Sequence, residues 1–370
     1  MRIGVPKEIK DHEYRVGLTP EGVRLLCSEG HEVWIETNAG LRIGFPDLAY
    51  RDAGAHIGNS PAEIYDCELV VKVKEPQPLE FNLIRAGQTL FCYQHFAPNR
   101  NLLDHMLEAK ASCVAYETVT DAIGGFPLLA PMSQIAGRLS IQVGAWALQT
   151  ANGGSGVLLP GIPDVAPGKV VIIGAGTVGS NAAHIAVGMG ADVTILALNA
   201  PRLAQLERIY PGKIKTALSE PLTLAEHVAG ADLVIGAVLI AGKLPPKLIS
   251  RALLRKMRAG SVLVDVSIDQ GGIAETSRPT THSNPIYMDE GVVHYCVANM
   301  PSAVARTATL ALTRVTLPYV RALAKRGLKA ALSSDPGLKN GLQIHAGHIT
   351  YKNLADEMGK PFVPPEQVLA

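Results

Sequence analysis

Three glycines follow an apolar run in the middle of the chain, in "KVVIIGAGTVGS" at 169–180. Gly174 permits a tight turn, Gly176 lets a phosphate group approach the backbone, and Gly179 lets the next helix pack closely on its strand. A helix that begins there, with Thr177 and Val178 in its first turn, presents N–H groups and the positive end of its dipole. Such turns also occur for packing alone, but the flanking strands "KVVII" and "DVTIL" favour a dinucleotide site.

The end of the second of these strands lacks an expected residue. An acidic side chain about 20 residues beyond the glycines normally binds the adenosine ribose, and this sequence has Ala197 there. Two interpretations stay open: relaxed use of NAD and NADP, with Arg202 beside a 2′-phosphate, or NAD use with Asn199 and the backbone contacting the ribose. The predicted cofactor is NAD, and NADP is the alternative.

Composition limits the class of protein. The chain has 370 residues, 47% of them hydrophobic and 18% charged, with a net charge of +1, which predicts two α/β domains. We expect no nucleic-acid partner because basic residues form no stripe. We expect no membrane span because apolar runs stop short of ~18 residues. The N-terminus does not read as a signal peptide. Five cysteines without a CxxC pair predict buried free thiols, a cytoplasmic protein and no metal site.

Strand and helix patterns alternate in two series, which predicts two doubly wound α/β domains. One is a Rossmann dinucleotide-binding domain over 128–306, and the other is a discontinuous Rossmann-like substrate domain over 1–127 and 307–370. A long helix is expected in "PMSQIAGRLSIQVGAWALQTAN" at 131–152, as a connector on which one domain could pivot. The predicted strands are 2–6, 32–37, 69–74, 89–95 and 112–117, then 169–174, 192–196, 213–217, 232–238, 261–266 and 292–297.

Longer segments resemble the NAD-dependent L-alanine dehydrogenase family over nearly the whole chain. They include "IGVPKEIKDHEYRVGLTP", "VVKVKEPQP", "PLLAPMSQIAGRLSIQ", "VLVDVSIDQGG" and "VVHYCVANMPSAVARTAT". The resemblance implies reversible oxidative deamination of L-alanine to pyruvate and ammonia by a homohexamer. Nicotinamide nucleotide transhydrogenases share several segments, but their matching portion is usually followed by membrane segments, which we do not find in this sequence.

The resemblance also assigns roles to four polar residues. Arg15 would grip the substrate carboxylate with its planar fork, and Lys74 would contact the carboxylate or carbonyl oxygen. His95 would be the general acid–base, since imidazole titrates near ~6.5, and Asp269 would position water or ammonia and support the proton relay. Taken singly, each residue is as typical of a surface, structural or turn position. Their joint occurrence within the matching segments favours the catalytic interpretation.

Further contacts to the cofactor are implied around these residues, although apolar and hydroxyl side chains also serve packing. His282 and His294 are expected to be structural, and Tyr93 and Tyr116 to be core or wall residues. The sequence departs from the family pattern at Pro160, Asp164 and Ser302, each in place of a glycine. The implied cofactor contacts are Met132, Ser133, Ser219, Val238, Leu239, Ile268, Asp269, Asn299 and Met300.

Two rival functions remain at this point. One is a dehydrogenase for another small amino acid, and the other is a regulatory protein that holds a dinucleotide without turnover. Arg15, Lys74, His95 and Asp269 together argue against the second, because a non-catalytic protein has no need of all four. If the chain is an enzyme, we expect substrate and cofactor to bind in different domains and a cleft between them to close and exclude water.

Overall fold

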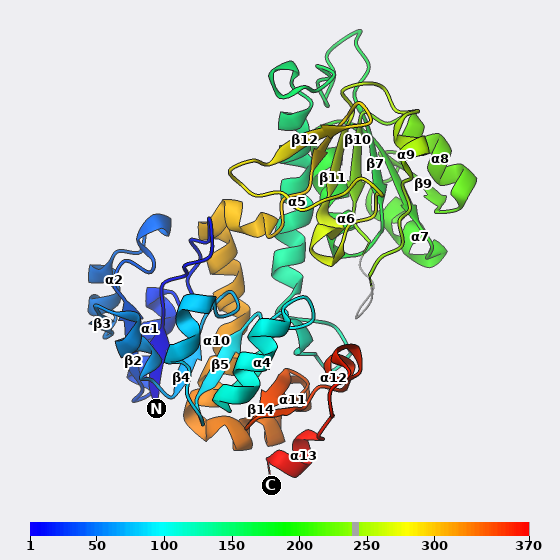
Figure 1. The fold of residues 1–370 in the computed structure, drawn as a ribbon. Helices are drawn as coiled ribbons and strands as arrows, with labels where there is room; N and C mark the ends of the chain where they lie inside the picture. Colours follow the sequence, from blue (N-terminus) through cyan, green and yellow to red (C-terminus); the bar gives the residue numbers. More distant parts are fainter. Residues whose placement is uncertain (239–243, 370) are drawn as a thin grey trace. The chain divides into compact units, whose positions relative to one another are not determined.

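The computed structural model describes residues 1–238 and 244–369. The chain divides into two compact units: a first unit of Met1–Met132 with Val304–Ala370, and a second unit of Ser133–Ala303. Each unit is built on one sheet of mostly parallel strands with helices around it, so the predicted α/β class is confirmed (Figure 1).

The sheet of the first unit has the order β15-β14-β6-β5-β4-β1-β2-β3. Its six parallel strands follow the doubly wound order 3-2-1-4-5-6, whose direction reverses between β1 and β4. Such a switch point leaves a crevice at the carboxyl ends of the strands. The strands are β1 (Arg2–Val5), β2 (Glu32–Glu36), β3 (His56–Gly58), β4 (Leu69–Val71), β5 (Thr89–Cys92), β6 (Ser112–Ala115), β14 (Leu342–His345) and β15 (His348–Ile349).

Helices cover both faces of this sheet. α3 and α4 both contact η2, whereas α1 contacts α2 and α10. Thr19 caps α1 by accepting a hydrogen bond from the backbone N–H of Gly22. The long helix α10 is interrupted at Gly327, whose φ is 74°. The helices are α1 (Pro20–Ser28), α2 (Asp47–Asp52), α3 (Pro61–Tyr65), α4 (Arg100–Ala109), α10 (Ala305–Ser334), α11 (Pro336–Lys339), α12 (Lys352–Met358) and α13 (Pro365–Val368), with 3₁₀ turns η1 (Leu41–Ile43), η2 (Pro78–Leu83) and η3 (Tyr116–Thr118).

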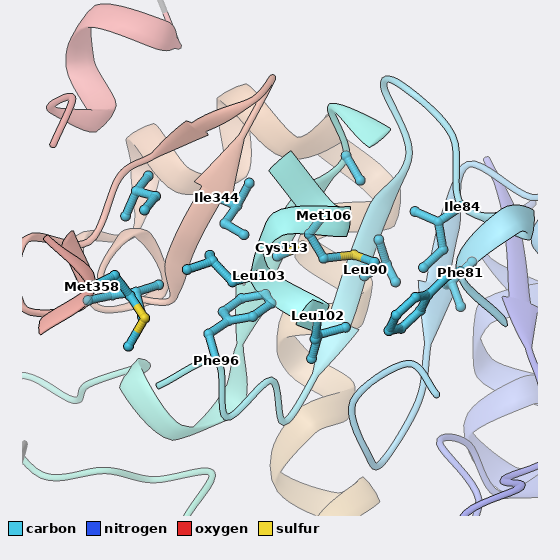
Figure 2. Close-up of a cluster of buried hydrophobic side chains, with 14 of the residues drawn as sticks. Phe81, Ile84, Leu90, Phe96, Leu102, Leu103, Met106, Cys113, Ile344 and Met358 are labelled. Atoms are coloured by element: carbon cyan, nitrogen blue, oxygen red, sulfur yellow. The ribbon is translucent and has the colours of Figure 1, made fainter. Parts of the chain in front are cut away.

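A hydrophobic core joins α4 to the sheet (Figure 2). Leu102, Leu103 and Met106 lie on one side of α4 and are fully buried, because they recur at helical spacing. They pack with Leu90 of β5 and Cys113 of β6. Each such side chain contributes roughly 1.5–3 kcal/mol by leaving water. This packing holds the carboxyl ends of β5 and β6 in place.

The sheet of the second unit has the order β12-β13-β11-β10-β7-β8-β9. Without the antiparallel edge strand β12 this is again 3-2-1-4-5-6, with the switch between β7 and β10. The strands are β7 (Lys169–Ile173), β8 (Asp192–Ala197), β9 (Ile214–Leu218), β10 (Leu233–Gly236), β11 (Val262–Asp265), β12 (Ile286–Asp289) and β13 (Val292–Tyr295). The helices are α5 (Ala130–Ala147), which begins in the first unit, α6 (Thr177–Gly188), α7 (Ala200–Ile209), α8 (Pro221–Ala229) and α9 (Arg251–Leu254), with η4 (Thr150–Asn152), η5 (Val266–Gln270) and η6 (Met300–Val304).

All eleven predicted strands are present, and four others were missed. β3, β12, β14 and β15 are short and lie toward sheet edges, where pairing with a neighbour rather than an apolar pattern decides the conformation. The predicted long helix ends at Ala147 rather than at 152, because a 3₁₀ turn follows it. Four of the five cysteines are buried and all five are free, as expected.

Candidate active site

Polar side chains of the first unit gather at four neighbouring strand ends. Lys74, His95 and Glu117 each lie within about three residues of the ends of β4, β5 and β6. Arg15 lies about ten residues beyond β1, in the segment whose Gly17 packs against Val71 of β4. These strands are adjacent and parallel, so their carboxyl ends meet at one edge of the sheet. The switch point between β1 and β4 lies within this group. Three of the four predicted polar residues are therefore brought to the same edge.

The side chain of Arg15 is held in one orientation. It is only 1% exposed, and its Nε and Nη2 donate to the two carboxylate oxygens of Glu13 at 2.7 and 2.6 Å. Its Nη1 donates to Sδ of Met132 at 3.1 Å. Burial by itself would lower the pKa of Arg15, but the hydrogen bond and charge of Glu13 outweigh burial and raise it. The guanidinium is thus permanently charged and held in one orientation.

A close backbone contact brings this segment over β4. A Cβ atom at Gly17 would lie 2.5 Å from the carbonyl oxygen of Val71, the last residue of that strand. Any side chain at position 17 would push the segment away from the sheet. The glycine therefore lets the residues after β1 cross the switch point toward Lys74.

Glu8 fixes the backbone that carries Lys74. Its Oε1 accepts hydrogen bonds from the backbone N–H of Val73 at 2.7 Å and of Lys74 at 3.2 Å. Its Oε2 lies 3.3 Å from Nζ of Lys72, which also donates to Glu80 at 2.7 Å. Burial raises the pKa of Glu8 to about 7, against the opposing effect of Lys72. Buried charges of this kind are tolerated only when paired, and here they brace the end of β4.

Glu117 holds the residues around His95. Its carboxylate accepts from the backbone N–H of Gln94 at 3.1 Å and of His95 at 2.7 Å, and its Oε1 is 3.9 Å from Nδ1 of the imidazole. His95 has a φ of 46°, a conformation that non-glycine residues adopt only where surrounding contacts enforce it. The ring stacks on Tyr93 with an interplanar angle of 8°, and its side chain is 43% exposed. An oriented and accessible imidazole beside a carboxylate suits proton transfer.

Lys74 and His95 share an electrostatic neighbour. Glu75 is buried, and Lys10 donates to it at 2.5 Å. Burial would raise the pKa of Glu75, but Lys74, Lys10 and His95 together lower it. The carboxylate therefore partly balances the positive charge that gathers at this edge. Tyr93 is 3% exposed and Tyr116 is fully buried, as expected of core or wall residues.

In the second unit the glycine turn has the geometry that a dinucleotide needs. Gly174 has a φ of 112°, and a Cβ there would lie 2.3 Å from the carbonyl oxygen of Ala237; one at Gly179 would lie 1.8 Å from that of Gly174. A Cβ at Gly176 would meet no atom within 4 Å. Gly176 is also the N-cap of α6, and no side chain caps that helix. The first N–H groups of α6, with Thr177 and Val178, thus begin beside open space at Gly176, the kind of position at which helix N-termini bind phosphate groups.

The residues after β8 replace the usual acid with a different arrangement. Ala197 ends the strand and is 8% exposed, and its carbonyl accepts from the N–H of Ser219. Asn199 caps α7, because its Oδ1 accepts from the N–H of Arg202 at 2.9 Å. Nε of Arg202 donates to the carbonyl of Ala175 at 3.0 Å. The guanidinium therefore lies against the glycine turn, while Oδ1 of Asn199 is engaged by the helix cap.

The ends of β10 and β11 are tied to each other. Ser267 donates to the carbonyl of Val238 at 2.8 Å and accepts from its N–H at 3.0 Å. Asp265 is fully buried, and burial raises its pKa although it accepts from the N–H of Ile273 at 2.7 Å and from Ser277 at 2.6 Å. This pairing shapes the turn that leads to Asp269. The predicted contact Leu239 lies outside the described residues.

Asp269 belongs to the second unit, in the 3₁₀ turn η5. It is exposed, and its Oδ1 accepts from the backbone N–H of Asn299 at 3.3 Å. Ile268 and Met300 are each 3% exposed, so their side chains serve packing as well. Ser133 is half-buried near the start of α5. His294 is fully buried between Thr276 and a backbone carbonyl, which confirms its structural role.

Sequence reasoning missed the acidic residues that orient the predicted ones. Glu13 and Glu75 lie beside Arg15 and Lys74 in the chain, and Glu117 directly follows β6. Acidic residues are common at such positions, so the sequence did not distinguish them. Only the fold tells which of them turn inward. Among the described residues no group of three or more His, Cys, Asp or Glu could hold a metal ion. The missed residues are Glu8, Glu13, Glu75 and Glu117.

Comparison with known proteins identifies the family. Family models described as "Alanine dehydrogenase/PNT, N-terminal domain" and "Alanine dehydrogenase/PNT, C-terminal domain" match residues 4–136 and 140–352. The chain belongs to this family. The alanine dehydrogenase of Halomonas elongata is 52% identical over 98% of each chain, and that of Bacillus subtilis is 50% identical over all of this chain and 98% of its own.

A solved structure described as L-alanine dehydrogenase agrees with the fold. It has a TM-score of 0.94 and 48% identity, and covers 97% of this chain and 99% of its own. The family resemblance predicted from the sequence is therefore confirmed. None of the helices in the described part of the chain has both the length and the apolar character to cross a membrane.

Proposed function

We propose that the chain is an L-alanine dehydrogenase, which catalyses the reversible oxidative deamination of L-alanine to pyruvate and ammonia with hydride transfer to a nicotinamide dinucleotide. Identity near 50% to curated alanine dehydrogenases over the whole chain supports this reaction. The observation that carries the proposal is the gathering of Arg15, Lys74 and His95 at adjacent strand ends of the first unit, each braced by an acidic partner.

We propose that the first unit binds the amino acid. Arg15 holds its carboxylate, because the Glu13 ion pair fixes the plane of the guanidinium and charge-assisted hydrogen bonds are the strongest available. Lys74 binds the carboxylate or the carbonyl oxygen of the oxo acid, and its positive charge attracts the negatively charged pyruvate. A panel of substrates will show how long a side chain the site accepts.

His95 and Asp269 handle the protons in this proposal. When bound, the nicotinamide ring accepts the hydride that leaves the α-carbon of alanine. His95 takes a proton from the water that adds to the resulting iminium carbon and gives it to the nitrogen. The carbon–nitrogen bond then breaks, ammonia leaves, and the new hydroxyl returns its proton to His95 as it becomes the carbonyl of pyruvate. Asp269 orients the water or ammonia. Tyr93 stacks on His95 and keeps the ring in one plane.

The second unit binds the dinucleotide, and we propose NAD as the cofactor with NADP also accepted. The open space at Gly176 and the uncapped start of α6 suit the pyrophosphate. Near the adenosine ribose, Ala197 has no negative charge that would repel a 2′-phosphate, and the positive charge of Arg202 would attract it. The helix cap uses only Oδ1 of Asn199, so its Nδ2, together with the backbone and Ser219, can contact the ribose hydroxyls. We also propose a cytoplasmic homohexamer, on the family resemblance.

A spectrophotometric assay tests the function. Purified protein is mixed with pyruvate, ammonium and NADH, then with NADPH, and loss of the reduced cofactor is followed by absorbance. We expect turnover with both cofactors, and the reverse reaction with L-alanine. A panel of other 2-oxo acids separates an alanine enzyme from one for another amino acid. No turnover with any 2-oxo acid would contradict the proposal and favour a dinucleotide-binding protein without catalysis.

A further inference from the structure

Hydrogen bonds connect His282 and Ser302, through Asn299, to Asp269. The reaction described above gives no role to the first three of these residues. Ser302, in η6, is 3% exposed. Its hydroxyl donates to the backbone carbonyl of Asn299 at 3.0 Å and lies 2.9 Å from Nε2 of His282. The N–H of Asn299 in turn donates to Asp269 at 3.3 Å. Four residues from three separate segments of the second unit are thereby linked.

The direction of these bonds follows from counting protons. A serine hydroxyl has one proton, and here it goes to the carbonyl of Asn299. Ser302 can then bind His282 only by accepting, so Nε2 of His282 carries a hydrogen. The same nitrogen lies 3.4 Å from the carbonyl of Asn299, which is a position for a donor and not for a lone pair. The three contacts agree on one arrangement.

The arrangement holds Asn299 in an uncommon conformation. Its φ is 66°, in the left-handed region that non-glycine residues seldom occupy without support. Its carbonyl accepts from the backbone N–H of Ser302 at 3.1 Å, which any residue at 302 could supply, and the Ser302 hydroxyl and His282 add two further contacts that depend on side chains. Its own N–H meets the carboxylate of Asp269. Because Asp269 is exposed and could rotate, the position of that N–H influences which way the carboxylate points.

We propose that Ser302, supported by His282, is a positioning residue for Asp269. It fixes Asn299 so that the backbone N–H orients the carboxylate for its role in the reaction, and the proposal rests on that role. Ser302 stands where the family resemblance predicts glycine, and glycine has no hydroxyl to make these bonds. The arrangement around Ser302 is therefore a property of this chain. We expect it to raise the rate of the chemical step and to leave substrate affinity unchanged.

Ser302→Ala tests the proposal with the full-length protein. One hydrogen bond to a backbone group is removed, so we expect kcat for pyruvate reduction to fall about 3- to 10-fold. KM for pyruvate and Kd for NADH, measured by fluorescence titration, should stay within about twofold. Ser302→Thr keeps the hydroxyl and should retain most of the rate. Ser261→Ala is the matched control, because Ser261 is a fully buried serine immediately before β11 that donates to the carbonyl of Ala231.

A double variant tells whether Ser302 acts through Asp269. In an Asp269→Asn background, Ser302→Ala should lower kcat by less than about twofold, since coupled residues are not additive. Equal losses in both backgrounds, or a Ser302→Ala enzyme with wild-type kcat, would overturn the inference. Where the Asp269→Asn rate is too low to measure, the Ala-to-Thr comparison decides. An inactive wild-type protein would instead reject the proposed function and this inference with it; an active wild type with an unaffected Ser302→Ala rejects the inference alone.

Discussion

The residue at the end of β8 offers the sharpest test of cofactor recognition. Ala197→Asp restores the carboxylate that dinucleotide sites of this fold normally carry at this point. Ala197 is the last residue of the strand, and its carbonyl is already engaged by Ser219. A side chain added there should therefore reach the ribose hydroxyls without changing the strand.

The size of the effect follows from the charges involved. Charge-assisted hydrogen bonds contribute roughly 1.5–3 kcal/mol, so Kd for NADH should fall by about 10-fold or more. For NADPH the same carboxylate repels the 2′-phosphate and competes for Arg202, which lies against the glycine turn. We expect kcat/KM for NADPH to fall by at least about 10-fold, so that the preference for NADH rises about 100-fold.

The assay compares kcat/KM for the two reduced cofactors at saturating pyruvate and ammonium. Met288→Asp is the control for net charge, since Met288 is 52% exposed on β12, at the opposite edge of the sheet from β9. Arg202→Gln should lower kcat/KM for NADPH and leave NADH nearly unchanged. If Ala197→Asp had the same ratio of kcat/KM for NADH to kcat/KM for NADPH as the wild type, our account of cofactor recognition at this turn would be refuted.

Four other changes have outcomes that the structure sets. His95→Gln should lower kcat by about 100-fold or more, because general acid–base groups contribute ~10²–10⁴; full activity would exclude the acid–base role. Glu117→Gln should lower kcat, since one of the two carboxylate oxygens that accept from the backbone N–H groups of Gln94 and His95 is replaced by a donor, whereas wild-type kcat would exclude a role for Glu117 in orienting His95. Gly179→Ala should weaken NADH binding and lower the unfolding free energy by about 1–3 kcal/mol, as the added Cβ would meet the carbonyl of Gly174 at 1.8 Å; wild-type titration and melting curves would contradict this. Glu8 has a pKa raised from 4.5 to about 7 in the folded protein, so the folded state holds an extra proton between these values and this residue's contribution to stability falls as pH rises through them. Glu8→Gln should remove that slope from urea unfolding curves taken between about pH 5 and 7.5, and an unaltered slope would assign it to other groups.

Much of the fold could be predicted from local patterns. Strands such as "LVV" of β4 and "KVVII" of β7 are short apolar runs bounded by turn residues, and central parallel strands are buried on both faces. The edge strands were not predictable in this way. β12 and β15 are stabilised by a neighbouring strand that is antiparallel to them, and that pairing is a property of the sheet rather than of their own residues.

The candidate site divides in the same manner. The glycine turn was recognised from its spacing because its function depends on local backbone geometry, at Gly174, Gly176 and Gly179. Arg15, Lys74 and His95 were recognised by family resemblance. Glu8 was missed because it is far from Lys74 in the chain and becomes its neighbour only where β1 lies beside β4. Glu13 was missed for another reason, since it is close to Arg15 in the chain but only the fold shows that it turns inward.

The sequence alone determined the alternation of strands and helices, the dinucleotide turn and the absence of an acid at position 197, because each depends on residues close together in the chain. Tertiary structure alone decided that Arg202 lies on the glycine turn and that Ser302 meets His282. A hydrogen bond needs its two atoms within about 3 Å of each other, and for residues distant in sequence only the packed fold supplies that distance.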